Sequence, residues 1–92
     1  MPSYLIETFL ARGDAGALAK REQLARSAAE KLSQTGVHVR FEGAIHVPRD
    51  EICFFIFEAP SGRDAAVAAH HAELDALRVV EAVSSANEQE EK

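Results

Sequence analysis

The chain has 92 residues and a net charge of −5, with 47% hydrophobic and 27% charged residues. A chain of this length predicts one domain with a modest core, and its acidic balance excludes a protein that follows nucleic-acid phosphates with a basic patch. The single cysteine, Cys53, excludes an intramolecular disulfide and a zinc site built from cysteines of one chain, and no apolar run approaches the length of a membrane helix. We therefore expect a cytoplasmic globular protein with no nucleic-acid and no membrane partner.

The first half of the chain predicts a strand, a helix and a second strand. Residues 3–9 alternate between two sides, as a strand does, with Glu7 as their one charged residue. Helical spacing follows from about residue 15 to residue 33, with Asp14 as the expected N-cap and Gly36 as the expected stop. Residues 37–47 alternate again between an apolar side and a charged side. Gly43 is a candidate β-bulge, which would change the facing of everything after it.

The second half is centred on six consecutive apolar residues, 52–57, which include three of the five phenylalanines. Such a run predicts a central strand that is apolar on both faces. Residues 48–50 form the expected hairpin turn before it, and Ser61 with Asp64 predicts the start of a second helix. Residues 78–83 predict a last short strand. The folded domain is expected to span residues 1–83, and residues 84–92 are expected to be a disordered polar, acidic tail.

The order of these elements, βαββαβ, predicts a ferredoxin-like α+β fold. Right-handed crossovers place both helices on one face of a four-stranded antiparallel sheet, with the first and third strands in the centre. The opposite face is then open and apolar, so that either a ligand such as single-stranded RNA or a second copy covers it. The acidic charge argues against RNA. We therefore expect a homodimeric α+β barrel whose two sheets enclose a cavity.

Several polar and aromatic side chains are expected to line this cavity and to bind a small molecule. Glu7 and Glu81 stand out because each is the one charged residue in an apolar alternation, where charge is costly unless it is paired or solvated. Arg40 is the expected counter-ion, and a structural ion pair and a role as ligand or general base both fit these carboxylates. The expected ligand-binding residues are Tyr4, Glu7, Arg40, Glu42, Phe55 and Glu81.

Histidines supply the candidate metal ligands, because neutral imidazoles suit borderline ions such as nickel and zinc. His38 and His46 are eight residues apart, too far to chelate one ion from a single straight strand, so another strand or subunit would have to unite them. Solvated strand histidines are the competing interpretation. His71 follows His70 on the second helix, where a hydrogen bond into the core is the alternative to metal binding. The metal candidates are His38, His46 and His71.

Short motifs in this chain resemble a small domain family of unknown function. They are YLIE at residues 4–7, FFIFEAPS at residues 54–61, His71-Ala72 and RVVEAV at residues 78–83. The best-described type of that family is a nickel-binding protein that forms a dimeric ferredoxin-like α+β barrel. The resemblance spans residues 3–83, and it implies the same fold, a homodimer and nickel as the metal. His71 is the metal candidate that matches a family position.

Three functional hypotheses follow from the sequence. The first is a dimeric barrel that binds a divalent metal, with nickel favoured by the resemblance, or a small ligand. The second is a cofactor-independent enzyme, monooxygenase-like or isomerase-like, that acts on a hydrophobic small molecule with Glu, His, Arg or Tyr4 as acid or base. The third is a protein-interaction module that uses the open face of the sheet.

Overall fold

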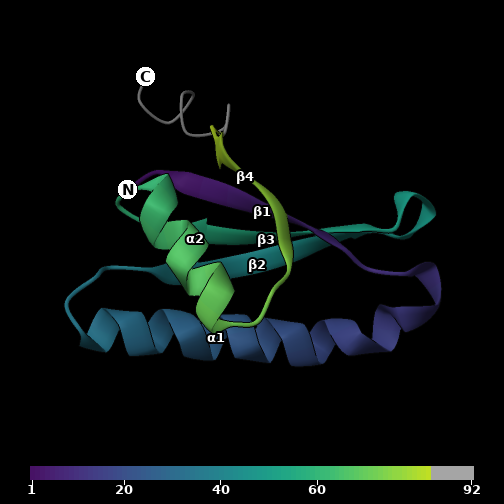
Figure 1. The fold of residues 1–92 in the computed structure, drawn as a ribbon, viewed down its shortest axis with the longest axis horizontal. Coiled ribbons are helices and arrows are strands. Elements are labelled where there is room, and N and C mark those ends of the chain that lie inside the picture. The colour runs from purple at the N-terminus through teal and green to yellow at the C-terminus, as the bar shows by residue number, and fades with distance from the viewer. Residues whose placement is uncertain (84–92) are drawn as a thin grey trace, which may run out of the picture.

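The computed structural model describes residues 1–83 and contains four strands and two α-helices in the predicted order (Figure 1). The tail expected at residues 84–92 lies outside the described part. The elements are β1 (Ser3–Phe9), a 3-10 segment (Arg12–Ala17), α1 (Leu18–Gln34), β2 (Arg40–Val47), a 3-10 turn (Pro48–Asp50), β3 (Ile52–Glu58), α2 (Gly62–His71) and β4 (Ala76–Ala82).

The four strands form one antiparallel sheet in the order β2-β3-β1-β4. This order confirms that the first and third strands are central, and with the βαββαβ sequence of elements it confirms the ferredoxin-like fold. In Figure 1, α1 runs along the length of the sheet beside β2, while α2 crosses in front of the strands at a steep angle. The two helices also pack against each other, and α2 lies over β1 and β4.

The first helix begins later than the sequence predicts. Residues Arg12–Ala17 form a 3-10 segment, and α1 starts at Leu18 after Ala17, whose side chain makes no capping hydrogen bond. Asp14 lies inside the 3-10 segment, so the prediction that it caps the helix is wrong. At the other end, Gly36 adopts a φ of 99° and its N–H donates to the Ser33 carbonyl at 3.1 Å, which confirms the predicted stop.

The second helix begins as predicted. The Ser61 hydroxyl accepts a hydrogen bond from the Asp64 N–H at 3.2 Å, and it donates to the Asp64 carboxylate at 3.0 Å. This pair satisfies one of the free N–H groups at the start of α2 and holds the N-terminal turn in place.

One face of the sheet forms the core beneath the helices. The largest fully buried side chains all come from β1, β3 or the residue that follows β1, and they are Ile6, Thr8, Leu10, Cys53, Phe55 and Phe57. Both helices meet them with small residues: α1 buries Ala25, Ala28 and Ala29, and α2 buries Ala65, Ala68 and Ala69. Alanine lets a helix lie close to the sheet, so the large side chains of the core come from the strands.

A β-bulge interrupts β2 at Gly43, as the sequence suggested. The pairing with β3 runs from Phe41 opposite Phe57 directly to Gly43 opposite Ile56, so Glu42 has no partner of its own. Gly43 has a φ of 151°, which L side chains rarely adopt, and this explains glycine at the bulge. The extra residue changes the phase of the strand: Ile45 moves to the face opposite the helices, and His46 moves to the helix side, opposite Cys53.

Neither α1 nor α2 combines the length and the apolar composition needed to cross a bilayer, among the residues that the structure describes.

Candidate functional site

The candidate site is the sheet face opposite the helices, which we call the open face. Its apolar side chains are half-buried or exposed, and those of Phe9 and Ile45 are 57% and 52% exposed. The register aligns them across the four strands: Ile45, Phe54 and Glu7 form one row, and Ile56, Leu5 and Val80 form the next. Together the apolar members are Leu5, Phe9, Ile45, Val47, Ile52, Phe54, Ile56 and Val80. Such a contiguous apolar surface is typical of an interaction site.

A shallow hollow lies on this face. It has a volume of about 560 Å³, and its apolar lining includes Leu5, Ile45 and Ile56. Its rim includes Ser3 at the start of β1, and Glu81 and Ala82 at the end of β4. The volume falls within the range of small-molecule pockets, although the hollow is open to solvent on one side.

The Glu7 carboxylate on the open face forms an ion pair with Arg78 of β4. Its Oε1 atom accepts from Arg78 Nε at 3.2 Å and lies 3.1 Å from Nη2. The two residues are direct partners in the β1–β4 register, so the contact follows from strand pairing. The Glu7 side chain is 19% exposed, and the pairing explains how a carboxylate is tolerated among apolar neighbours.

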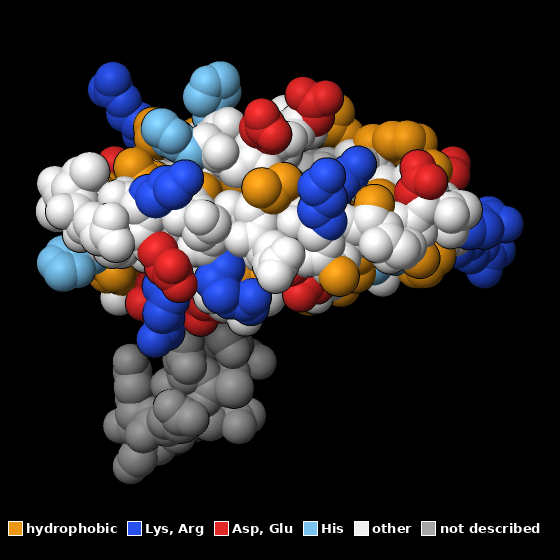
Figure 2. All heavy atoms as spheres, turned by 90° about the horizontal axis from the view of Figure 1, so that it is seen from below, with side chains coloured by type: hydrophobic (Ala, Val, Ile, Leu, Met, Phe, Trp, Pro, Cys, Tyr) orange, Lys and Arg blue, Asp and Glu red, His pale blue; other side chains and the backbone are white. Residues whose placement is uncertain are grey.

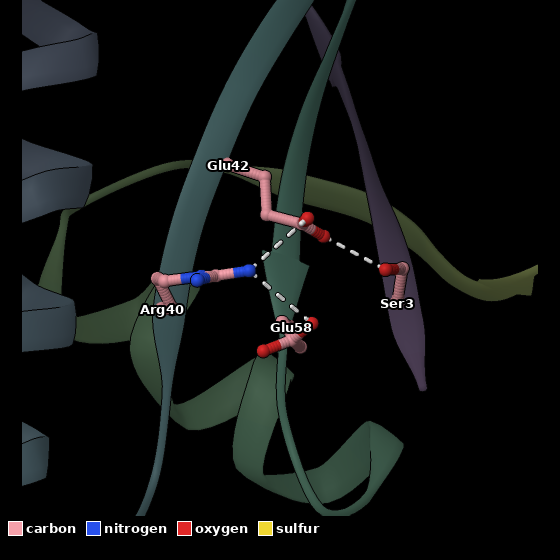
Figure 3. Close-up of polar contacts among 4 residues, drawn as sticks. All are labelled: Ser3, Arg40, Glu42 and Glu58. Atoms are coloured by element: carbon pink, nitrogen blue, oxygen red, sulfur yellow. Dashed lines mark hydrogen bonds and ion pairs between the residues drawn. The ribbon is translucent and has the colours of Figure 1, made fainter. Parts of the chain in front are cut away.

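A second polar group occupies the end of the open face near the start of β2 (Figure 3). Arg40 Nη2 lies 3.4 Å from Glu58 Oε2 and 3.8 Å from Glu42 Oε2. Ser3 Oγ donates to Glu42 Oε1 at 2.7 Å, which connects β1 to the bulge of β2. One guanidinium therefore serves two carboxylates, and the apolar surface is bordered by this group at one end and by the Glu7–Arg78 pair at β4.

The structure brings three of the six predicted ligand-binding residues to the open face: Glu7, Arg40 and Glu42. Arg40 was expected to be the counter-ion of Glu7, and this prediction is wrong. Arg78 lies directly opposite Glu7 in the strand register and forms the ion pair with it. Arg40 instead pairs within its own corner with Glu58 and Glu42.

The other three predicted ligand residues do not point as expected. Phe55 is fully buried beneath the helices, so the prediction that it lines the cavity is wrong. Tyr4 lies on the helix side, where a Cβ at Gly62 would be 3.4 Å from its ring. Glu81 is paired with Tyr4 in the register, on the side opposite to Leu5, although it borders the hollow at the edge of the sheet.

The three histidines predicted as metal ligands come from separate parts of the molecule. His38 is exposed in the segment between α1 and β2, His71 is exposed at the end of α2, and His46 lies on the helix side of β2. His71 therefore has no buried position in the core. His46 is partly buried, and its Nε2 atom has no hydrogen-bond partner within residues 1–83. No group of three or more His, Cys, Asp or Glu side chains placed to hold a metal occurs within these residues.

Cys53 is a buried thiol of the helix-covered face. Burial raises the pKa of this thiol, while Arg21 lowers it and Glu22 raises it further. The group therefore stays protonated at neutral pH and has little nucleophilic character.

A separate groove lies between the second half of α1 and the start of β2. Its volume is about 670 Å³, and its apolar floor includes Ala29, Val39 and Phe41. Arg26 of α1 lies over the Phe41 ring, with 5.4 Å between the guanidinium carbon and the ring centroid. Figure 2 looks onto the α1 side of the molecule, where basic and acidic side chains are interspersed and no patch of one sign dominates.

Three polar residues of the open face were missed at the level of sequence: Ser3, Glu58 and Arg78. Glu58 follows the apolar run of β3, and Arg78 begins the last predicted strand. Both residues therefore stand at the ends of predicted strands, where the sequence pattern does not show which face a side chain occupies. Cross-strand register would have found them, because it places Glu58 opposite Arg40 and Arg78 opposite Glu7.

Comparison with known proteins finds no relative of this chain. No family model matches the chain, and no curated protein or solved structure matches it. The resemblance to the nickel-binding family therefore stays a prediction based on short motifs.

Proposed function

We propose that this protein is a homodimer whose two open faces pack together and enclose a binding site for a small, mostly apolar molecule. The observation that carries the proposal is the continuous apolar surface of the open face, in which Phe9 and Ile45 are more than half exposed. A short domain buries a limited core of its own, and a second sheet would remove this surface from water.

The polar groups of the open face support the same arrangement. Glu7, Glu42 and Glu58 each have an arginine within 4.0 Å, so these carboxylates have partners when water is excluded around them. They border the apolar centre, and they can orient a polar group of a bound molecule. The hollow of about 560 Å³ on each copy supplies the space.

An apolar ligand is favoured over a metal ion for this cavity. His46 and His71 do not lie on the open face, so closing two such faces would leave these imidazoles outside the cavity. Within residues 1–83 one chain holds no cluster of metal-ligating groups, and a nickel centre would need carboxylates from two chains. A saturable signal below millimolar concentration in calorimetric titration with nickel or zinc would contradict this choice.

The dimer is tested by replacing Ile45, an exposed apolar residue of β2 on the open face, with aspartate. Ile45→Asp is expected to raise the dimer dissociation constant at least about 30-fold, because an unpaired charge would be buried at the interface. Val67→Asp is the matched control, since Val67 is 37% exposed on α2, away from the open face. Sedimentation equilibrium measures both. A wild-type chain that stays monomeric at micromolar concentration would overturn the proposal.

The ligand site is tested with a neutral apolar probe, 1-octanol, in calorimetric titration. Saturable binding is expected in the wild type and in Val67→Asp, and it should be lost in Ile45→Asp together with the dimer. Circular dichroism of Ile45→Asp should remain that of a folded chain. Binding that survives in a monomeric Ile45→Asp variant would contradict a site between the two sheets.

A further inference from the structure

The groove between α1 and β2 lies between the edge strand and a helix, and its floor belongs to the helix-covered side of the sheet. That floor is rigid: Phe41 is 8% exposed, and its ring packs against Phe57 and Phe55 at centroid distances of 5.4 and 6.3 Å. Val39 and Ala29 extend this surface and are 4% and 3% exposed. The groove is therefore preformed, and an apolar group in it would contact the parts of these side chains that remain exposed without a rearrangement of the core.

Arg26 gives the groove an uncommitted positive charge. Its i,i+4 neighbours on α1, Glu22 and Glu30, were positioned to pair with it, yet no carboxylate lies within 4.0 Å of its guanidinium among residues 1–83. Arg26 instead lies over the Phe41 ring, which restrains the planar group. The N–H donors of this guanidinium have no carboxylate partner among residues 1–83, and their fork geometry can bind a carboxylate in a bidentate manner.

Some of the remaining polar groups of the groove already have hydrogen-bond or ion-pair partners, and others have none within residues 1–83. Arg40 and Glu58 pair with each other, and the Ser33 hydroxyl donates to the Val39 carbonyl at 2.8 Å. Gln34 and His38 also line the groove and make no side-chain hydrogen bond within residues 1–83. Arg26 therefore offers free donors only, Glu30 offers free acceptors, and the Gln34 amide and the His38 ring can each act as donor or acceptor.

We propose that this groove binds a small organic carboxylate, with the carboxylate on Arg26 and the apolar body against the exposed parts of Phe41, Val39 and Ala29. Arg40 and Glu58 line the groove and also border the open face, but the residues proposed to hold the ligand, namely Arg26, Phe41, Val39 and Ala29, lie outside the open face, so the proposal does not require the dimer. Inorganic phosphate alone should bind more weakly than an aromatic carboxylate, because phosphate makes no use of the apolar floor.

The experiment is an NMR titration of the full chain with benzoate, benzyl alcohol, benzylamine and inorganic phosphate. Benzoate is expected to bind with a dissociation constant of about 1 mM and to shift the backbone amides of residues 38–41. Arg26→Gln should weaken benzoate binding about tenfold, because a charge-assisted hydrogen bond is lost. Lys20→Gln, which removes an exposed positive charge of α1 outside the groove, should leave it unchanged.

Two further variants make each outcome decisive. Arg26→Lys keeps the charge without the planar fork and should weaken benzoate binding about threefold. Ile45→Asp, which acts on the open face, should leave benzoate binding unchanged whatever it does to the dimer. Benzylamine binding as tightly as benzoate, shifts centred on the open face, or full affinity in Arg26→Gln would each overturn the proposal.

Discussion

The two faces of the sheet are built from the same kinds of residues and differ in what covers them. Phe54 and Phe55 are neighbours in β3, yet Phe55 is fully buried beneath the helices and Phe54 lies on the open face, half-buried. The helix-covered face is packed within the monomer, with alanines of both helices against the strand side chains. The open face has comparable apolar content and no covering element within residues 1–83. Folding of one chain accounts for the first face, whereas the second requires association or a ligand.

The largest expected contrast is between Phe55→Ala and Phe54→Ala. Phe55→Ala should lower the free energy of unfolding by about 3–5 kcal/mol, because it leaves a cavity in the packed core. Phe54→Ala should cost about 1 kcal/mol in the monomer, with a further loss that grows with protein concentration if the open faces associate. Urea denaturation at two protein concentrations measures both. Equal, concentration-independent losses would show that the two faces are covered alike within one chain.

A smaller loss of stability is expected at the Gly43 bulge, which determines the face of the sheet on which the β2 side chains lie. Gly43→Ala should lower the free energy of unfolding by about 1–3 kcal/mol, since alanine is strained at a φ of 151°. Gly13→Ala is the control, because Gly13 has no positive φ and a Cβ there would meet nothing within 4 Å. It should change stability by about 0.5 kcal/mol or less. A neutral Gly43→Ala would mean that β2 can lose its bulge and return Ile45 to the helix side.

The smallest effect concerns the ion pair of the open face. A double-mutant cycle with Glu7→Gln and Arg78→Gln should give a coupling energy below about 1 kcal/mol, because the Arg78 side chain is 67% exposed. A parallel cycle at Arg26 and Glu30, which make no ion pair, should give no measurable coupling. A larger Glu7–Arg78 coupling that rises with protein concentration would indicate that the pair is buried in a dimer.

The architecture was predictable because the spacing of apolar residues along the chain indicates most of its strands and helices. Alternation marked three of the strands, and helical spacing marked α1. The Ser61–Asp64 pair and Gly36 fixed two helix ends. Asp14 did not, because it lies inside the 3-10 segment that precedes α1, and a good capping residue does not by itself decide where a helix starts.

The facing of the site residues was less predictable, and β3 shows why. Its six apolar residues fit either phase of a strand equally well, so the pattern could not decide whether Phe54 or Phe55 meets the helices. For Glu81 the missing information was register, since β4 pairs with β1 so that Glu81 lies opposite Tyr4, on the helix side. For His71 it was helix phase: α2 turns its alanines inward and leaves Val67 and both histidines outside.

Gly43 also indicates which chemistry the backbone would accept at the bulge. A Cβ built there meets no atom within 4 Å, so there is space for a side chain. What disfavours an L residue at this position is the positive φ of the backbone. A φ of 151° has the opposite sign to the φ of an ordinary extended L residue. A D-alanine at position 43 of a chemically synthesised chain should therefore fit without strain. It should raise stability slightly, because it restricts the unfolded chain more than glycine does.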